Sequence, residues 1–177
     1  MIDPNKVIPS WTTEEERELL TKLAGEVQPK GLIVEIGALY GGTTAVLAKA
    51  APKAKVISID EFSWTPEGYP TATKELLESH LKEVDIQNVT VLEGKSEEIG
   101  KTWDKHIDLC FVDGGHSYKY VYADLCNFAP HSDVVACHDY NNPFWESIKQ
   151  AIDDFIQLFP EWVLAEVAGT VAVLRRK

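Results

Sequence analysis

Two short segments of the sequence gather acidic residues and histidines where they could bind a metal ion. Residues 111–118 read Phe-Val-Asp-Gly-Gly-His-Ser-Tyr, and residues 137–139 read Cys-His-Asp. Both segments end apolar runs that are typical of buried strands. Carboxylate oxygens are the ligands that Mg²⁺ prefers, and neighbouring strands would bring the two ends together. We therefore predict that Asp113, His138 and Asp139 bind one divalent cation, Mg²⁺ or another.

His116 lies three residues after Asp113 and could act as a general base. A bound cation lowers the pKa of a coordinated hydroxyl, and a histidine exchanges its proton near neutral pH. Asp113 and His116 are thus the predicted catalytic residues. Structural interpretations are also open: Asp113 as a turn residue before two glycines, His138 as a core histidine and Asp139 as a helix cap.

A glycine-bearing turn follows the apolar run 32–36. Gly37 and Gly41 lie between this run and a helical pattern that starts at Thr43. Glycines here would let a ligand approach backbone N–H groups and the N-terminus of the helix. Any strand-to-helix turn can also use glycine simply for its positive φ angles.

The next predicted strand ends at Asp60, 23 residues after Gly37. An acidic side chain near this spacing binds the ribose hydroxyls of a nucleoside in doubly wound sheets. The dinucleotide fingerprint G-x-G-x-x-G is absent because position 39 is leucine, which argues against NAD(P).

Alternating strand and helix patterns predict the fold that positions these residues. The expected strands are 32–36, 55–60, 89–93, 107–113 and 133–138; the expected helices are 13–27, 43–50, 72–84, 118–128 and 144–159, with a short one near Ser96. Two β-rich runs, 162–167 and 170–175, are separated by Ala168-Gly169 and predict a hairpin, so at least one terminal strand is antiparallel. We expect one α/β domain over residues 1–177, doubly wound, with helices on both faces of a mostly parallel sheet.

The pattern Glu35-x-Gly37-x-x-x-Gly41, together with Asp60 and the terminal hairpin, resembles class I S-adenosylmethionine-dependent methyltransferases. The resemblance implies a Rossmann-like, seven-stranded sheet of order 3-2-1-4-5-7-6 with an antiparallel C-terminal hairpin strand. It also implies S-adenosylmethionine as cofactor, with the glycine turn facing its methionine part and Asp60 its ribose. The residues expected to bind the cofactor are Glu35, Gly37, Ala38, Tyr40, Gly41, Thr43, Asp60, Glu61, Ser96 and Asp113. Lys95 departs from the family, since an aspartate is common at that position on the adenine side.

The pattern D-G-x-H-x-Y at residues 113–118, followed by His138-Asp139, is similar to the macrocin O-methyltransferase-like group. The broader family also includes cephalosporin-hydroxylase-like proteins. In that group the matching aspartates bind a divalent ion and the matching histidine is the proposed base. The resemblance therefore implies the same cation site and the same base as the residues themselves indicate.

Composition excludes several classes of protein. With 17 basic and 28 acidic residues the formal charge is −11, so the chain would repel nucleic acid. No stretch is apolar and long enough for a signal or a membrane span, and we expect a cytoplasmic protein. The three cysteines lie in apolar runs and are expected to be reduced core residues.

The expected activity is metal-assisted O-methylation of a hydroxyl on a small molecule, such as a sugar or another natural product. The alternatives are a catalytically silent protein that binds the cofactor and serves as a partner, and an NAD(P)-dependent oxidoreductase. The ring-rich segment 61–70, Trp11, Tyr40 and Phe144-Trp145 could form pocket walls, while Asp124 and Tyr118 are expected to be helix-surface or packing residues. The acceptor's identity and a homo-oligomeric state stay open.

Overall fold

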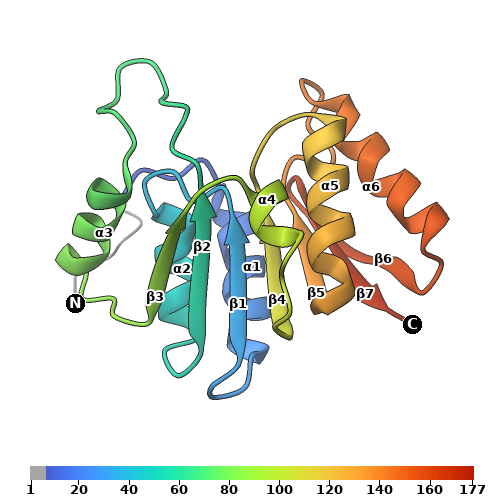
Figure 1. The fold of residues 1–177 in the computed structure, drawn as a ribbon, viewed down its shortest axis with the longest axis horizontal. Helices are drawn as coiled ribbons and strands as arrows, with labels where there is room; N and C mark the ends of the chain where they lie inside the picture. Colours follow the sequence, from blue (N-terminus) through green and yellow to red (C-terminus); the bar gives the residue numbers. More distant parts are fainter. Residues whose placement is uncertain (1–6) are drawn as a thin grey trace.

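A single seven-stranded sheet forms the centre of the molecule (Figure 1). The computed structural model describes residues 7–177, and its sheet has the order β3-β2-β1-β4-β5-β7-β6. The strands are β1 Leu32–Ile36, β2 Lys55–Asp60, β3 Val89–Glu93, β4 Ile107–Val112, β5 Ser132–Cys137, β6 Trp162–Ala168 and β7 Val171–Arg176. The first five strands are parallel, whereas β7 runs antiparallel to both β5 and β6. The predicted fold class and strand order are confirmed.

Helices cover both faces of this sheet, as Figure 1 shows. The helices are α1 Glu14–Glu26, α2 Gly42–Ala50, α3 Lys74–Glu83, α4 Ser96–Gly100, α5 Tyr118–Phe128 and α6 Glu146–Leu158. On one face, α1 and α2 pack their leucines against alternate residues of β1, β4 and β7. On the other face, α5 and α6 pack against the intervening residues of the same strands. Because strand side chains alternate between faces, each central strand is buried from both sides.

The helix boundaries follow from identifiable caps. Thr13 caps α1 by accepting a hydrogen bond from the backbone N–H of Glu16, and the Glu16 carboxylate accepts one from the backbone N–H of Thr13. This reciprocal pair is a capping box. Thr73 caps α3 through the backbone N–H of Leu76, so that helix begins at Lys74 rather than at Ala72 as expected. The other predicted boundaries agree to within two residues.

The cysteines are all free thiols, and Cys110 and Cys137 are fully buried in β4 and β5. Cys126 in α5 is only partly buried. Among residues 7–177, none of the helices combines the length and the apolar character that crossing a membrane requires.

Candidate functional site

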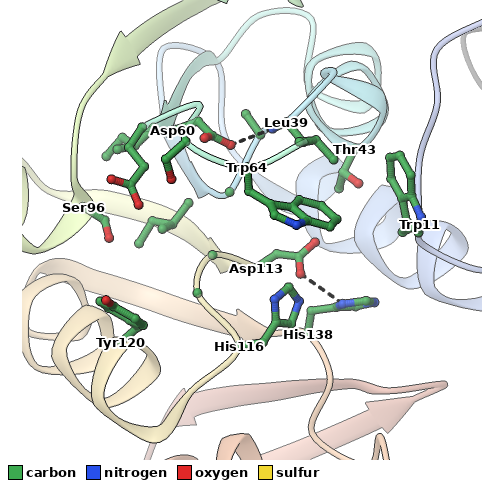
Figure 2. Close-up of a pocket in the computed structure, with 18 of the residues that line it drawn as sticks. Trp11, Leu39, Thr43, Asp60, Trp64, Ser96, Asp113, His116, Tyr120 and His138 are labelled. Atoms are coloured by element: carbon green, nitrogen blue, oxygen red, sulfur yellow. Dashed lines mark hydrogen bonds and ion pairs between the residues drawn. The ribbon is translucent and has the colours of Figure 1, made fainter. Parts of the chain in front are cut away.

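A pocket of about 680 Å³ opens at the carboxyl edge of the parallel strands (Figure 2). This volume lies in the range of small-molecule sites. The residues after β1, β2, β3, β4 and β5 all contribute to its lining. The predicted site residues that line it are Gly37, Ala38, Tyr40, Thr43, Asp60, Glu61, Ser96, Asp113, His116, His138 and Asp139. The structure thus brings nearly the whole predicted set to one pocket; Glu35 and Gly41 do not line it.

A ladder of backbone hydrogen bonds forms the floor of the pocket. The residue that follows each strand donates its N–H to a carbonyl at the end of the neighbouring strand. The pairs are Gly94 to Asp60 (2.8 Å), Gly37 to Ile59 (2.9 Å), Asp113 to Ile36 (2.8 Å) and His138 to Val112 (3.0 Å). The ladder places four site-bearing loops in a fixed register next to one another.

The turn after β1 needs glycine for both conformation and space. Gly37 has φ of +88° and Gly41 has φ of +86°. A Cβ on Gly37 would lie 2.0 Å from the carbonyl oxygen of Asp113, so only glycine lets β1 pass this close to the exit of β4. Gly41 precedes α2 in the left-handed conformation and aims the N-terminal end of that helix toward the pocket.

Asp60 ties the first two loops together. Its Oδ2 accepts a hydrogen bond from the backbone N–H of Leu39 (2.7 Å), and its Oδ1 accepts one from Phe62 (2.7 Å), as Figure 2 shows for Leu39. A carboxylate has about four acceptor positions, so two are left for a ligand. Asp60 therefore orders the pocket wall and can still bind hydroxyl groups.

Glu35 lies beneath the turn, not in the pocket. Its side chain is fully buried, and its Oε2 accepts hydrogen bonds from the hydroxyls of Thr44 and Ser58. Among residues 7–177, its Oε1 has no hydrogen-bond partner. Burial raises the pKa of Glu35 to about 7, against the opposing effect of the two hydroxyl donors. Glu35 thus packs between β1, β2 and α2.

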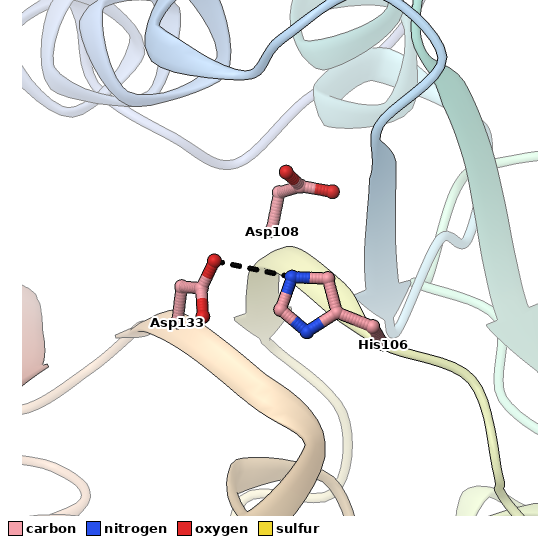
Figure 3. A group of neighbouring side chains, drawn as sticks. All are labelled: His106, Asp108 and Asp133. Carbon is pink, nitrogen blue, oxygen red and sulfur yellow. Dashed lines mark ion pairs between the residues drawn. The ribbon is translucent and has the colours of Figure 1, made fainter.

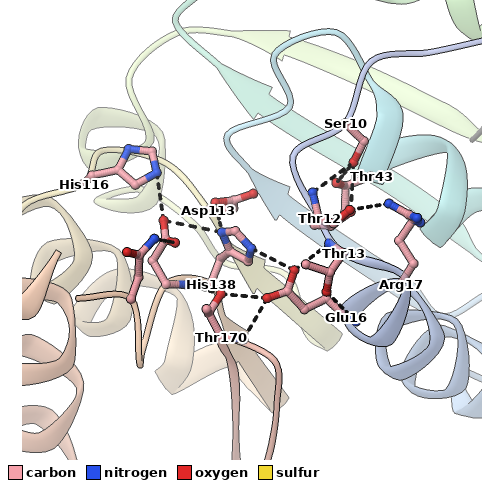
Figure 4. Close-up of polar contacts among 12 residues, drawn as sticks. Ser10, Thr12, Thr13, Glu16, Arg17, Thr43, Asp113, His116, His138 and Thr170 are labelled. Carbon is pink, nitrogen blue, oxygen red and sulfur yellow. Dashed lines mark hydrogen bonds and ion pairs between the residues drawn. The ribbon is translucent and has the colours of Figure 1, made fainter. Parts of the chain in front are cut away.

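Two aspartates and two histidines meet on the opposite side of the pocket (Figure 4). His116 Nε2 lies 3.0 Å from Asp139 Oδ2. His138 Nδ1 lies 3.0 Å from Asp113 Oδ1 and 3.4 Å from Asp139 Oδ2. All four predicted catalytic and metal-binding residues are therefore in contact.

Charge pairing sets the pKa values in this cluster. Burial works against ionisation of Asp139, but its contacts with His116 and His138 and the hydrogen bond from Asn142 outweigh it and lower the pKa of Asp139. Burial also works against a charged His138, yet Asp113 and the other carboxylates raise its pKa to about 12. The hydrogen bond to Asp139 raises the pKa of His116. The cluster is a compact array of alternating charges.

The donor atoms are suitable for a hard divalent cation. One ligand atom each from Asp113, His116 and Asp139 lie within 4.8 Å of one another. His138 offers a second nitrogen once a cation displaces its proton, because its Nδ1 is buried beside both carboxylates and makes no aligned hydrogen bond within residues 7–177. Two carboxylates with one imidazole nitrogen fit a mixed oxygen and nitrogen site.

A second group of titratable residues lies at the other end of the sheet (Figure 3). His106 Nε2 contacts Asp133 Oδ2 at 3.1 Å, and both side chains are more than 60% exposed. Asp108 beside them already accepts a hydrogen bond from the backbone N–H of Leu32 (2.7 Å). Exposed ion pairs of this kind contribute little to stability, so we assign no binding or catalytic role to these three residues.

Sequence reasoning missed Glu16 and left the place of Asp124 open. Glu16 is only 1% exposed and reaches His138 from α1, 122 residues away in the chain. Asp124 is also 1% exposed, so of its two expected places, on the helix surface or in the packing, it occupies the second. It packs beside Gly114, and burial raises its pKa to about 7.

Aromatic side chains surround the mouth of the pocket. Trp11, Tyr40, Trp64 and Trp145 line it, and the Trp145 ring lies 5.1 Å from that of His116 at an angle of 31°. Figure 2 shows the Trp64 indole over Asp113. Phe144, in contrast, is 86% exposed and does not line the pocket.

Comparison with known proteins gives the family. A family model described as a methyltransferase domain (Methyltransf_24) matches residues 34–140, more than half of the chain. The chain has no significant match among curated protein sequences.

Solved structures with the same fold include several methyltransferases. The O-methyltransferase NovP is 18% identical with a TM-score of 0.75, over 92% of this chain and 80% of NovP. The Podospora anserina methyltransferase PaMTH1, solved with S-adenosylhomocysteine, is 19% identical with a TM-score of 0.70, over 98% and 84%. The O-methyltransferase TomG from Streptomyces achromogenes, solved with S-adenosylmethionine, is 18% identical with a TM-score of 0.68, over 94% and 81%. With the family match and the strand order, these findings show that the chain belongs to the methyltransferase domain family and has the class I S-adenosylmethionine-dependent methyltransferase fold.

Proposed function

We propose that this protein transfers the methyl group of S-adenosylmethionine to a hydroxyl of a small molecule, with help from a divalent cation. The observation that carries the proposal is the shared pocket. The glycine turn and Asp60 line the same cavity as Asp113, His116, His138 and Asp139. A nucleoside-type site and an acid–base cluster therefore face each other at one edge of the sheet.

The cofactor's place follows from the first three loops of the pocket. Asp60 and Glu61 are positioned to accept hydrogen bonds from ribose hydroxyls, and Ser96 lies on the expected adenine side. Residues 37–40 and Thr43 surround the space next to the N-terminal end of α2, where the methionine part would lie. When bound, the cofactor supplies an electrophilic methyl group beside Asp113.

The remaining loops would handle the acceptor. Asp113, Asp139 and His138 would hold the cation, which lowers the pKa of a bound hydroxyl. The His116 imidazole would receive the hydroxyl proton on the ring nitrogen that does not contact Asp139, while the oxygen–carbon bond forms and the sulfur–carbon bond breaks. His116 is suited to this role because its side chain is 39% exposed, in contrast to 10% for His138. It therefore faces an incoming acceptor.

The aromatic mouth indicates what kind of acceptor fits. Trp64 and Trp145 border the space over His116 and Asp113. Indole rings bind flat or apolar faces while leaving hydroxyl recognition to the polar groups below. A hydroxylated sugar or natural product presents both kinds of surface.

A thermal-shift plate tests the cofactor first. S-adenosylhomocysteine should raise the melting temperature, because ligands that bind only the native state stabilise it, and NAD(P) should not. The reverse result would identify an oxidoreductase. Adding Mg²⁺ or EDTA to the same plate tests the cation.

Methyl transfer is tested with labelled S-adenosylmethionine and a pool of hydroxylated metabolites. His116→Ala should lower the rate by about 10²- to 10⁴-fold, the usual contribution of a general base, while stabilisation by S-adenosylhomocysteine is kept. His106→Ala is the matched control, because His106 makes an equivalent contact with Asp133 outside the pocket. No transfer to any acceptor by the wild type, despite cofactor binding, would favour a catalytically silent partner protein.

A further inference from the structure

Glu16 connects the N-terminal helix to the acid–base cluster. Its Oε2 accepts a hydrogen bond from the backbone N–H of Thr13 (2.7 Å) and lies 3.4 Å from His138 Nε2. Its Oε1 accepts two hydrogen bonds from Thr170, from the backbone N–H (2.7 Å) and the hydroxyl (2.8 Å). Figure 4 shows these contacts converging from α1 and the β6–β7 turn. A capping box alone would need only the contact with Thr13.

The position of this carboxylate is set independently of His138. The capping box fixes it from α1, and Thr170 fixes it from the hairpin turn. Gly169 leaves the necessary room, because a Cβ there would lie 2.7 Å from both Cγ and Oε1 of Glu16. With its carboxylate anchored on two elements, Glu16 can orient the histidine, not merely follow it.

The orientation of His138 determines what faces the two aspartates. An imidazole carries its nitrogens on different edges of one rigid ring, so directing Nε2 at Glu16 leaves Nδ1 directed at Asp113 and Asp139. That Nδ1 atom is buried and makes no aligned hydrogen bond. Histidines that bind metals characteristically donate their other N–H to a carboxylate, which fixes the ring and its tautomer. The Glu16–His138 pair has this arrangement.

We propose that Glu16 is a positioning residue that holds His138 Nδ1 toward the Asp113–Asp139 pair and so shapes the cation site. The inference rests on the proposed function for the cation, but the orientation of His138 can be tested without one. Glu16 touches neither the acceptor space nor the cofactor pocket, since it does not line the cavity. It contacts the cluster directly at His138 and indirectly through Thr170, whose hydroxyl accepts a hydrogen bond from the backbone N–H of Asp139 (3.3 Å).

The test compares Glu16→Gln with Glu15→Gln. Glutamine keeps the size and one acceptor oxygen for the capping contact with Thr13, but it loses the charge opposite His138 Nε2 and replaces the oxygen that faces Thr170 with an NH₂ group. Glu15 is in the same first turn of α1 and is exposed, so its variant controls for a lost helix-end charge. The first readout is the ¹⁵N–¹H spectrum of the His138 ring without metal. We expect unchanged ring signals in Glu15→Gln and shifted or split signals in Glu16→Gln.

The second readout is Mn²⁺ binding by calorimetry, with stabilisation by S-adenosylhomocysteine measured in parallel. Loss of an outer carboxylate typically weakens metal binding 10- to 100-fold, and we expect this range for Glu16→Gln with unchanged cofactor binding. Thr170→Val keeps the charge and the backbone N–H contact with Glu16, but it removes the hydroxyl that contacts Glu16 and accepts a hydrogen bond from the backbone N–H of Asp139. It should therefore give a smaller loss in the same direction. If Glu16→Gln does not fold, Thr170→Val provides the test in its place.

Three outcomes would decide against the proposal or separate it from the cation site. Unchanged ring signals and unchanged Mn²⁺ affinity in both Glu16→Gln and Thr170→Val would overturn it. Equal loss of cofactor and metal binding would also overturn it, since that indicates a general structural effect. If the wild type binds no Mn²⁺ but Glu16→Gln still changes the His138 ring signals, the cation site fails while the positioning role stands.

Discussion

Glu35 and Asp113 each lie next to the apolar residues of a central strand, yet only the side chain of Asp113 lines the pocket. Asp113 is the first residue after β4, whereas Glu35 is inside β1 and points to the side of the sheet that α2 covers. The alternation of side chains along a strand accounts for this difference. An acidic residue just past the strand end can therefore contact a ligand. One inside the strand must find its hydrogen-bond donors within the protein.

The burial of Glu35 gives the protein a pH-dependent stability. Its pKa rises from 4.5 to about 7 on folding, so between these values the folded protein holds a proton that the unfolded chain has released. Stability then decreases as the pH rises, and Glu35→Gln removes this contribution. Between pH 4.5 and pH 8, we expect the free energy of unfolding of the variant to rise relative to that of the wild type by roughly 3 kcal/mol at most. Urea unfolding at a series of pH values measures this difference.

The exposed Glu15 supplies the control for this measurement, because Glu15→Gln removes a carboxylate that remains in water. A stability difference between Glu35→Gln and wild type that stays constant with pH would show that Glu35 is charged in the folded protein.

Strands and helices follow local sequence patterns and can be predicted from them. Contacts between elements far apart in the chain have no such local pattern. Runs such as 32–36 and the hairpin 162–175 are recognisable by their apolar content, β-branched residues and turn glycine. The strand order, which is also confirmed, was implied by the resemblance to class I methyltransferases and not by these patterns. The Glu16–His138 contact has no such signal, because Glu14, Glu15 and Glu16 all suit a helix start equally well. Only the packing of α1 beside the β6–β7 turn distinguishes the third glutamate.

The β1–α2 turn should tolerate no side chain at its first glycine. Gly37→Ala would place a Cβ against the backbone of Asp113 in addition to the strain of a positive φ. Gly68→Ala separates the two effects, because Gly68 has φ of +83° but no atom within 4 Å of the added Cβ. We expect Gly68→Ala to cost about 1 to 2 kcal/mol and Gly37→Ala clearly more, by chemical unfolding.

Gly37→Ala should also lose its melting-temperature response to S-adenosylhomocysteine, while Gly68→Ala keeps it. Equal stabilities for the two variants would mean that the turn can move away from Asp113.

At the scale of the whole molecule, the residues proposed for the reaction lie in two halves of one sheet. The loops after β1, β2 and β3 form the proposed cofactor side, and those after β4 and β5 carry the cation cluster. Both halves share the cores above and below the sheet, which α1, α2, α5 and α6 cover. The pocket therefore depends on the integrity of the entire fold.

The reactivity of the three cysteines measures whether the fold is intact. Burial raises the pKa of the Cys110 and Cys137 thiols, and Cys126 is partly buried with a raised pKa as well. Thiolates are the reactive form, so native protein at pH 8 should react with dithionitrobenzoate at no more than one thiol, Cys126. Unfolding in urea should release all three. Fast reaction of two or more thiols in native buffer would indicate that β4 and β5 open readily.

The backbone ladder across the pocket floor has an energetic consequence. Gly37 on the proposed cofactor side and Asp113 on the cation side are joined to adjacent strands by successive N–H to carbonyl bonds, and their backbones are packed too tightly for an intervening methyl group. A ligand that shifts one loop must shift the other or strain the ladder. Occupancy of the two halves should therefore be cooperative, and by reciprocity each ligand alters the affinity for the other by the same factor.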